Sequence, residues 1–511
     1  MIQGFLRSNI IKGGNGLITI HRVLERNARK HSKKEAFISK TARLTYPDMN
    51  SAANRLARYL QEKGVKRKDH VAVLSRNNEH FFYAYFALMK LGAIPIPLNG
   101  RLTANEMIPI LENMDTVGVL FESVFSTVIH EVNNQLNIPH PFSIEKAVEQ
   151  SLSYSTDNLH LPIDHRDICQ IVLTSGTTGV PKGVQFTHEQ IIAAATGIAI
   201  EFHISSKDRA LTLMPLSHSA PLNLFFMAPF YCGATHIIGD YAPQDFLKWI
   251  QEEKTTLTFA APIAYLLAAK DQGLATSDLS SMRLFAYGGG AMPLASFQFV
   301  SQAFNNKNFY QVYGLTEAGP NGCYLRPEEH QLKPGSIGKT SVVNVEMKVL
   351  TDEGTETAPG EYGEIVLKGD SLMAGYYKND ADTLDALKDG WLHSGDIAYR
   401  DEDGFFYIVD RKKDVIIPGG VNVYPREIEE VLTRHPDVSQ ACVVGVEHGE
   451  WGETIKAVIV LKEDSLVEER ELRQFVADHL AEYKNPRLYS FVKELPYNAS
   501  GKILKQKVKE M

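Results

Sequence analysis

Apolar and polar positions along the chain follow two periods, and the pattern switches repeatedly between the strand type and the helix type. Residues 44–64, LTYPDMNSAANRLARYLQEKG, predict a short strand and then a helix that Asp48 can cap and Gly64 can end. Residues 70–75, HVAVLS, form an apolar run of strand length, and residues 79–92 predict a mostly buried helix. This alternation favours an α/β fold with largely parallel sheets.

The alternation continues through the middle of the chain and then changes character. The apolar runs RALTLMPLS (209–217), TLTFAAP (256–262) and RLFAYGGG (283–290) are separated by stretches long enough for helices. From about residue 340, short alternating segments with turn signals predict a β-rich subdomain, and residues 401–417 predict a hairpin.

The last part of the chain predicts a separate small domain. Pro425 can open a helix, and the apolar segments 439–446 and 454–461 predict two further strands. These elements could form a compact α+β domain of their own. The join near VDRKKD (409–414) is short and charged, as an exposed connection between domains would be.

Composition narrows the class of protein. The 511 residues suggest about three folding units, and 44% apolar with 22% charged residues is ordinary for a globular chain. The net charge of −8 gives no overall basic field, so a nucleic-acid partner is not favoured.

Cysteine usage and hydropathy indicate a reducing compartment and no membrane span. The cysteines are far apart and without a CxxC spacing, which disfavours a zinc site and favours a cytoplasmic location: Cys169, Cys232, Cys323 and Cys442. The longest apolar run, 81–98, is interrupted by Lys90 and ended by prolines, so we expect no stable membrane span. The N-terminus lacks the apolar region of a signal peptide.

The stretch LTSGTTGVPKGV (173–184) combines flexible glycines with hydroxyl side chains and a lysine directly after an apolar run. Glycines let backbone N–H groups approach phosphate oxygens, while hydroxyls and Lys182 add donors and charge. The spacing is not that of a Walker A loop. The alternative is a solvent-exposed turn, which does not require so many hydroxyl groups.

This stretch resembles the signature of the adenylate-forming acyl-CoA synthetase superfamily, and the resemblance extends from about residue 20 to 505 with further motifs in family order. It implies that the loop embraces the β- and γ-phosphates of ATP. The implied contacts are Thr174, Ser175, Gly176, Thr177, Thr178, Gly179 and Lys182. Leu173 departs from the tyrosine of many members, at a position outside the phosphate contacts.

The resemblance also implies the domain organisation. We expect an α/β fold in which residues 1–410 form a large AMP-binding domain of two packed α/β subdomains plus a β-rich subdomain. Residues 411–413 would be a hinge, with Lys413 at its centre, and residues 414–511 a small mobile α+β lid domain.

The segment YGLTE (313–317) offers a flat aromatic face, a hydroxyl and a hard carboxylate oxygen suited to Mg²⁺. On its own it could equally be a strand end with a surface glutamate. The resemblance implies that Gln311, Tyr313 and Gly314 lie at the adenine, that Thr316 lies near the α-phosphate, and that Glu317 binds the metal.

The segment YGGGA (287–291) could be a tight turn. By resemblance it forms the wall between the adenine and the acyl pocket, with Gly290 and Ala291 on the nucleotide side and Gly288 and Gly289 on the acyl side. His218 in PLSHSAPLN would then border the carboxylate end of the pocket, and Phe225 would line it. A lone histidine is otherwise more often a core or turn residue.

Charged residues near the C-terminal end complete the implied site. A carboxylate and a guanidinium can hydrogen-bond a ribose diol, and Asp396 and Arg411 match the ribose contacts of the family, although each alone could be half of a surface ion pair. Lys502 in NASGK matches the catalytic lysine of the family, although alone it would be one surface lysine among several.

Coenzyme A would lie beyond the hinge. The resemblance implies that the pantetheine tunnel is lined by Gly419 and Gly420, which without it are simply a turn. Lys484 could meet a phosphate of coenzyme A, although an exposed lysine is the simpler interpretation.

The resemblance implies an AMP-forming acid–thiol ligase that uses ATP, Mg²⁺ and coenzyme A. We expect a medium- or long-chain fatty acid as substrate. The alternatives are an aryl acid such as coumarate or benzoate, an adenylation enzyme that loads a carrier protein, and a nucleotide-binding homologue without catalysis. The oligomeric state is left open, with a homodimer as one option.

Overall fold

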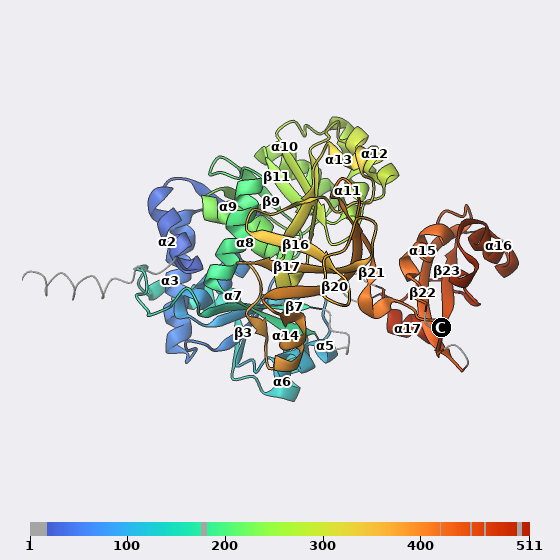
Figure 1. The fold of residues 1–511 in the computed structure, drawn as a ribbon. Coiled ribbons are helices and arrows are strands. Elements are labelled where there is room, and N and C mark those ends of the chain that lie inside the picture. Colours follow the sequence, from blue (N-terminus) through green and yellow to red (C-terminus); the bar gives the residue numbers. More distant parts are fainter. Residues whose placement is uncertain are drawn as a thin grey trace, which may run out of the picture. The chain divides into compact units, whose positions relative to one another are not determined.

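The computed structural model describes residues 18–174, 181–418, 421–449, 452–463, 465, 467–497 and 503–511. The chain divides into two compact units (Figure 1). Unit 1 runs up to Met347 and includes Leu367–Leu392, and unit 2 comprises Lys348–Val366 and the chain from His393. The hinge that we predict at residues 411–413, with domains at 1–410 and 414–511, stays a prediction.

Unit 1 contains a nine-stranded sheet whose centre is parallel, as the apolar runs predict. Antiparallel strands flank the parallel centre at both edges. The strands in spatial order are β15 (Thr340–Ser341), β14 (Gly322–Leu325), β13 (Phe309–Gly314), β12 (Leu284–Gly288), β11 (Leu257–Ala260), β9 (Arg209–Thr212), β10 (Thr235–Ile238), β1 (Glu35–Ile38) and β2 (Arg43–Thr45).

Two smaller sheets complete unit 1. One is parallel throughout and has the order β4 (Ile94–Pro97), β3 (His70–Leu74), β5 (Gly118–Phe121) and β6 (His140–Ser143). The other is antiparallel, with the order β18 (Gly375–Tyr376), β8 (Lys182–Thr187) and β7 (Ile168–Thr174). The first confirms the predicted strand at residues 70–75 and makes a second α/β layer.

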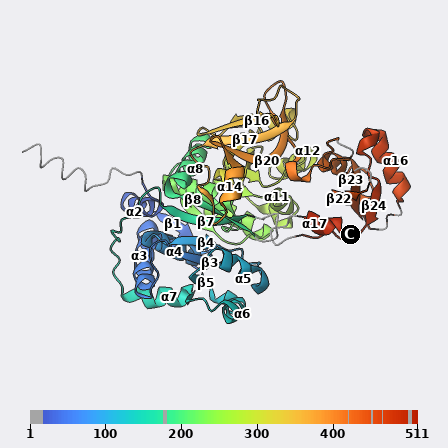
Figure 2. The ribbon, with the colours of Figure 1, turned by 60° about the horizontal axis from the view of Figure 1, so that its bottom comes forward.

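Helices pack beside these sheets, and Figure 2 shows α3 to α7 around β3, β4 and β5. The described helices of unit 1 are α2 (Ile20–Lys30), α3 (Tyr46–Glu62), α4 (Glu79–Leu91), α5 (Ala104–Asn113), α6 (Ser126–Leu136), α7 (Ile144–Gln150), α8 (His188–Glu201), α9 (Met227–Cys232), α10 (Pro243–Glu253), α11 (Pro262–Ala269), α12 (Leu294–Ala303), α13 (Glu329–Leu332) and α14 (Asp380–Ala386).

The start of α3 corrects one prediction. The N-cap is Thr45, whose hydroxyl accepts a hydrogen bond from the backbone N–H of Asp48, while the carboxylate of Asp48 accepts from the backbone N–H of Thr45. Asp48 is therefore the third helical residue (N3), the partner of the N-cap in a capping box, and not the cap itself. Gly64, at φ +100°, follows the end of the helix as predicted.

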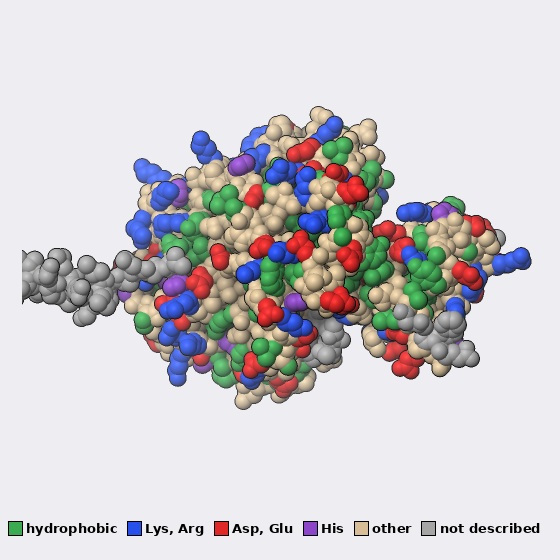
Figure 3. All heavy atoms as spheres, in the orientation of Figure 1, with side chains coloured by type: hydrophobic (Ala, Val, Ile, Leu, Met, Phe, Trp, Pro, Cys, Tyr) green, Lys and Arg blue, Asp and Glu red, His purple; other side chains and the backbone are tan. Residues whose placement is uncertain are grey.

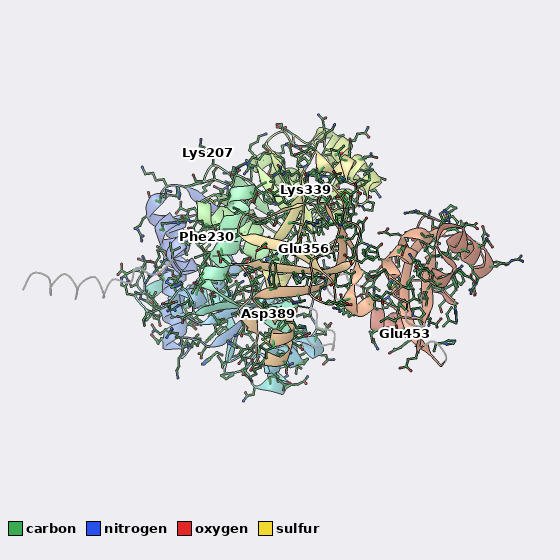
Figure 4. All side chains as sticks on the ribbon, in the orientation of Figure 1. Lys207, Phe230, Lys339, Glu356, Asp389 and Glu453 are labelled. Atoms are coloured by element: carbon green, nitrogen blue, oxygen red, sulfur yellow. The ribbon has the colours of Figure 1, made fainter. Side chains whose placement is uncertain are left out.

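The core of unit 1 is strongly aromatic. Phe37, Phe82, Phe86, Phe226 and Phe230 are nearly or fully buried and lie ring against ring, and Figure 4 shows Phe230 inside the unit while Lys207 projects from its periphery. Burial of each such side chain stabilises the fold by roughly 1.5–3 kcal/mol. Phe226 therefore belongs to this buried aromatic core.

The β-rich part forms a five-stranded sheet, in which β21 (Phe406–Arg411) pairs with β20 (Trp391–Arg400) and the other strands are β16 (Val345–Leu350), β17 (Gly363–Gly369) and β19 (Leu387–Lys388). The predicted hairpin at residues 401–417 is wrong in its bounds, because the first strand is β20 and Asp401–Phe405 is only the turn.

The C-terminal part of unit 2 has its own core, as the sequence predicts. An α+β arrangement surrounds buried side chains that include Ile428, Val443 and Leu472. Its elements are α15 (Pro425–Leu432), β22 (Val438–His448), β23 (Gly452–Leu461), α16 (Glu469–His479), β24 (Leu488–Phe491) and α17 (Lys505–Lys509).

Three further properties concern the surface charge, the helices and the cysteines. Both signs of charge are interspersed on the visible face of each unit (Figure 3). Across the described residues, every helix is too short or too polar to cross a bilayer. Cys169, Cys323 and Cys442 are buried, Cys232 is half-buried, and none of the four forms a disulfide.

Candidate functional site

The predicted phosphate loop joins the antiparallel strands β7 and β8 in unit 1. Thr174 ends β7 and is the register partner of Lys182, which begins β8, so both side chains stand where the loop leaves and re-enters the sheet. Ser175, Gly176, Thr177, Thr178 and Gly179 lie outside the described residues. The flanks of the loop thus bring a hydroxyl and an ammonium group to one sheet end.

Lys182 contacts two side chains that sequence reasoning missed. Its Nζ lies 2.5 Å from Oδ2 of Asp382 and 4.8 Å from the centre of the Tyr376 ring. The hydrogen bond from Lys182 lowers the pKa of the Asp382 carboxyl group. Tyr376 is brought here because β18 pairs with β8, with Tyr376 opposite Val184.

Tyr376 also holds the predicted metal ligand. Its hydroxyl donates a hydrogen bond of 2.8 Å to Oε1 of Glu317, which lies in the short 3₁₀ turn η5 (Thr316–Ala318). Burial, and then the negative charge of Glu317, raise the pKa of Tyr376 far above its usual range, so the phenol keeps its proton. Lys182, Tyr376 and Glu317 therefore form one connected group.

The carboxylate of Glu317 suits a Mg²⁺ ion that is also bound by substrate phosphates. Within the described parts of the chain, no group of three or more His, Cys, Asp or Glu side chains could hold a metal. Mg²⁺ is commonly bound through one or two carboxylates together with substrate phosphates rather than by an all-protein cage. A single carboxylate oriented by Tyr376 next to Lys182 suits that kind of site.

Thr316 and the His218 segment meet. The hydroxyl groups of Thr316 and Ser219 are 2.9 Å apart, and Ser219 follows partly buried His218 directly in sequence. Ser219 is not among the predicted site residues, although its position next to His218 could have indicated it. The contact brings the predicted α-phosphate residue close to the predicted carboxylate end of the acyl pocket.

The predicted adenine residues lie on β13. The side-chain oxygen of buried Gln311 accepts a hydrogen bond of 3.2 Å from the hydroxyl of Tyr287 on the neighbouring strand β12. Tyr313 is partly exposed near the end of β13. At Gly314 a Cβ atom would lie 1.7 Å from the carbonyl oxygen of Pro320, so only glycine fits there.

The glycine wall presents bare backbone. Gly288 is buried, and a Cβ atom on it would lie 2.7 Å from the carbonyl oxygen of Val312. Gly289 and Gly290 are exposed, with nothing within 4 Å of an added Cβ, and Ala291 is exposed as well. The open space beside this segment agrees with a wall that a flat or extended ligand can approach.

Phe225 lies in a π-helix, η3 (Ala220–Phe226), which begins two residues after His218. Its ring stacks on Phe259 with centroids 4.5 Å apart and planes 12° apart, and an atom of the Phe259 ring is 3.4 Å from a Cβ built on Gly288. Single π-turns occur often at functional sites. Phe225, Phe259 and Gly288 thus form one apolar surface, of which Phe259 was missed by sequence reasoning.

In unit 2, the predicted ribose residues pair with each other. Asp396 on β20 and Arg411 on β21 are register partners, and Nε of Arg411 lies 2.6 Å from Oδ1 of Asp396. Asp396 is buried while nearly half of the Arg411 side chain is exposed. A ribose diol would meet a carboxylate that the guanidinium already orients.

The remaining predicted residues of unit 2 have mixed outcomes. Lys413 is exposed in the 3₁₀ turn η6 (Lys412–Asp414) directly after β21. Lys484 is engaged by Glu427, at 2.7 Å from both carboxylate oxygens, so it is not simply the exposed lysine of the alternative interpretation. Gly419, Gly420 and Lys502 lie outside the described residues.

Comparisons with known proteins agree with these features. The AMP-binding enzyme family matches residues 24–377, and the AMP-binding enzyme C-terminal domain matches residues 427–502. A feruloyl-CoA synthase of Amycolatopsis sp is 35% identical over 91% of this chain and 93% of that protein. The long-chain-fatty-acid–CoA ligase FadD13 of Mycobacterium tuberculosis is 33% identical over 96% of this chain and 97% of that protein.

A solved structure extends the likeness to three dimensions. The o-succinylbenzoate CoA synthetase of Bacillus subtilis, in complex with its acyl-adenylate intermediate, is 29% identical and superposes with a TM-score of 0.84 over 96% of this chain and 98% of that one. Both family models, the relatives at full length and this fold agree. The chain belongs to the AMP-binding enzyme family, within the adenylate-forming acyl-CoA synthetase superfamily.

Proposed function

We propose that this protein is an ATP-dependent carboxylic acid–CoA ligase that acts on a medium- or long-chain fatty acid. The observation that carries the proposal is the convergence of Thr174, Lys182, Thr316 and Glu317 in unit 1, on segments that are far apart in sequence. The hydroxyl and ammonium groups can bind the phosphates of a nucleoside triphosphate, and the carboxylate can hold the Mg²⁺ that accompanies it.

In the first half-reaction, a carboxylate oxygen attacks the α-phosphorus of ATP, the bond to the β-phosphate bridging oxygen breaks, and pyrophosphate leaves. Two anions must meet, so the barrier is largely electrostatic. Lys182 would bind the β- and γ-phosphates, and the Thr316 hydroxyl would donate to the α-phosphate. When bound, Mg²⁺ neutralises phosphate charge, and Glu317 would hold it.

In the second half-reaction, the thiol of coenzyme A attacks the acyl carbon of the adenylate, AMP leaves, and an acyl thioester results. Lys502 would serve the first half-reaction only, and rotation of residues 414–511 about Lys413 would exchange the surroundings between the two steps. Gly419 and Gly420 would line the path of the pantetheine arm, and Lys484 would meet a phosphate of coenzyme A in exchange for Glu427.

The surface formed by Phe225, Phe259 and Gly288 supports an apolar acid. The likeness to a long-chain-fatty-acid–CoA ligase over nearly the whole chain supports an alkyl substrate. A second candidate is an aryl acid: the near-parallel stack of Phe225 on Phe259 also suits a flat ring, and a feruloyl-CoA synthase is about as similar. Loading of a carrier protein is a third option. A homologue without catalysis is not supported, because the chain belongs to a family of acyl-CoA ligases.

A panel assay separates these options. Pyrophosphate release would be measured with laurate, palmitate, ferulate and benzoate, each with and without coenzyme A, and acyl-CoA would be identified by mass spectrometry. We expect CoA-dependent thioester formation to be fastest with a fatty acid. Faster turnover of ferulate would favour the aryl-acid ligase, and release without thioester would favour a carrier-loading enzyme. The absence of any acid-dependent release would contradict catalysis.

A cytoplasmic location and a homodimer stay predictions.

A further inference from the structure

Lys182 is held by a built arrangement and not by a chance surface contact. Its partner Asp382 sits in the first turn of α14, where Nδ2 of Asn379 donates a hydrogen bond of 2.8 Å to Oδ2 of Asp382. The hydroxyl of Thr383, one residue later, accepts a hydrogen bond of 2.9 Å from the backbone N–H of Tyr376 on β18. Because β18 pairs with β8, which carries Lys182, the carboxylate is fixed opposite the ammonium group.

Both partners remain accessible to a competing anion. The exposed fraction of the side chain is 26% for Lys182 and 43% for Asp382. Ion pairs at this level of exposure are weak, so an anion of higher charge can replace the carboxylate. Oδ2 of Asp382, which Lys182 contacts, is the same kind of hard oxygen acceptor as a phosphate oxygen, and one ammonium group has few donors to share between them.

We propose that Asp382 is an internal competitor of the ATP phosphates for Lys182. The carboxylate gives up Lys182 when the β- and γ-phosphates bind, and it takes the ammonium group back as pyrophosphate leaves. This inference rests on the proposed function, because it takes Lys182 as a phosphate-binding lysine. Asp382 is therefore a positioning residue that sets the affinity for phosphate and does not touch the reacting atoms.

The exchange also reaches the predicted metal ligand. The Tyr376 ring lies under the Lys182 ammonium group while its hydroxyl binds Glu317. When Lys182 moves from Asp382 toward a phosphate, it therefore moves across the ring of Tyr376, whose hydroxyl group orients Glu317. The triphosphate and the metal would be received by one connected set of side chains, with Asp382 as the group that is displaced.

The test is the substitution Asp382→Asn, with binding of inorganic pyrophosphate and of ATP measured by titration calorimetry in magnesium chloride. Removing the competitor is expected to tighten both affinities by about three- to fivefold, which is the upper part of the range that an exposed ion pair allows. Asp380→Asn is the matched control, because Asp380 is exposed in the same turn of α14 and its loss changes the net charge equally. Its affinities should stay within about twofold of the original protein.

A double substitution separates competition from a general charge effect. In a Lys182→Ala background, Asp382→Asn should no longer change the affinity for pyrophosphate, because the group for which they compete is gone. Unchanged affinities in Asp382→Asn, with circular dichroism and melting temperature showing a folded protein, would overturn the inference. An equal gain in Asp380→Asn, or a persisting gain without Lys182, would also overturn it. Failure of the unsubstituted protein to bind either ligand would instead remove the proposed function.

Discussion

At the scale of single residues, close backbone contact decides which positions accept a side chain. Gly314 ends β13 and is paired with Gly322 on β14, and between them runs the turn that carries Thr316 and Glu317. The 1.7 Å separation between a Cβ at Gly314 and the Pro320 oxygen means that this turn can close only over a glycine. The site therefore depends on the absence of one carbon atom.

Gly314→Ala is expected to destabilise unit 1 by about 1–3 kcal/mol, the cost of an added carbon atom that forces the backbone to shift. The midpoint of urea unfolding, followed by circular dichroism, measures the change. Gly290→Ala is the control for stability, because an added Cβ there meets nothing within 4 Å. Equal midpoints for the two variants would contradict the crowding seen at Gly314.

The sequence predicts some residues of this site and gives no indication of others. Thr316 and Glu317 could be singled out because their motif carries a recognisable order of residues. Asp382 and Tyr376 could not, since a single aspartate or tyrosine in a polar stretch is most often solvated, and only the pairing of β18 with β8 brings them to Lys182. Long-range pairing of this kind leaves no local pattern in the sequence.

At the scale of secondary-structure elements, polar side chains at strand ends fasten the helices. Glu122 follows β5 and accepts hydrogen bonds from the backbone N–H of Arg76, from the side chains of Ser75 and Asn78, and lies 3.6 Å from His80. Burial alone would raise the pKa of Glu122, but these partners outweigh it and lower the pKa to about 2. The carboxylate thus ties the end of β5 to the start of α4.

This shift predicts a pH dependence of stability. The folded-state pKa of Glu122 is about 2, below the ordinary 4.5, so the carboxylate stabilises the fold fully above pH 4.5 and loses that contribution as the pH falls toward 2. Glu122→Gln should therefore cost about 3 kcal/mol at pH 7, and the cost should shrink in acid. Urea unfolding at pH 7, 5, 4 and 3 measures it. A cost that stays constant with pH would speak against an ionic role.

Elements were predicted better than their boundaries. The strands β3, β9, β11 and β12 follow from apolar runs, because a buried parallel strand has to be apolar on both faces. The cap of α3 differs from the prediction, since a capping box contains two residues that can each cap. The hairpin at residues 401–417 was displaced because β20 is long and mixed in polarity, and gave no alternating signal.

At the scale of the whole molecule, the proposed reaction assigns Lys502, near the C-terminus, to the first half-reaction only. Lys502→Ala is expected to abolish adenylate formation, a loss of about 100-fold or more for a group that meets developing charge, while thioester formation from supplied acyl-adenylate survives. Pyrophosphate release and thioester formation, assayed separately, measure the two steps. Lys507→Ala is the control, since Lys507 is an exposed lysine of the same segment. Equal loss of both steps would contradict this division.

The proposed hinge at Lys413 makes a complementary prediction. Proline fixes φ, so Lys413→Pro should restrict rotation at η6 and slow the second half-reaction more than the first. Lys413→Ala removes the same charge while leaving the backbone mobile, and it should stay close to the original rates. Single-turnover measurements of adenylate and of thioester formation compare the two variants. Equal slowing of both steps by proline would contradict the proposed hinge at Lys413.

The state of the four thiols has a practical consequence for following such a rotation. Burial raises the pKa of Cys169, Cys232, Cys323 and Cys442, that of Cys442 to about 12, so these sulfurs stay protonated near neutral pH and react slowly with electrophiles. An activated acyl group would therefore be spared capture by these four thiols. Dyes attached by maleimide chemistry to newly introduced surface cysteines should report distances during turnover, with the native cysteines left in place.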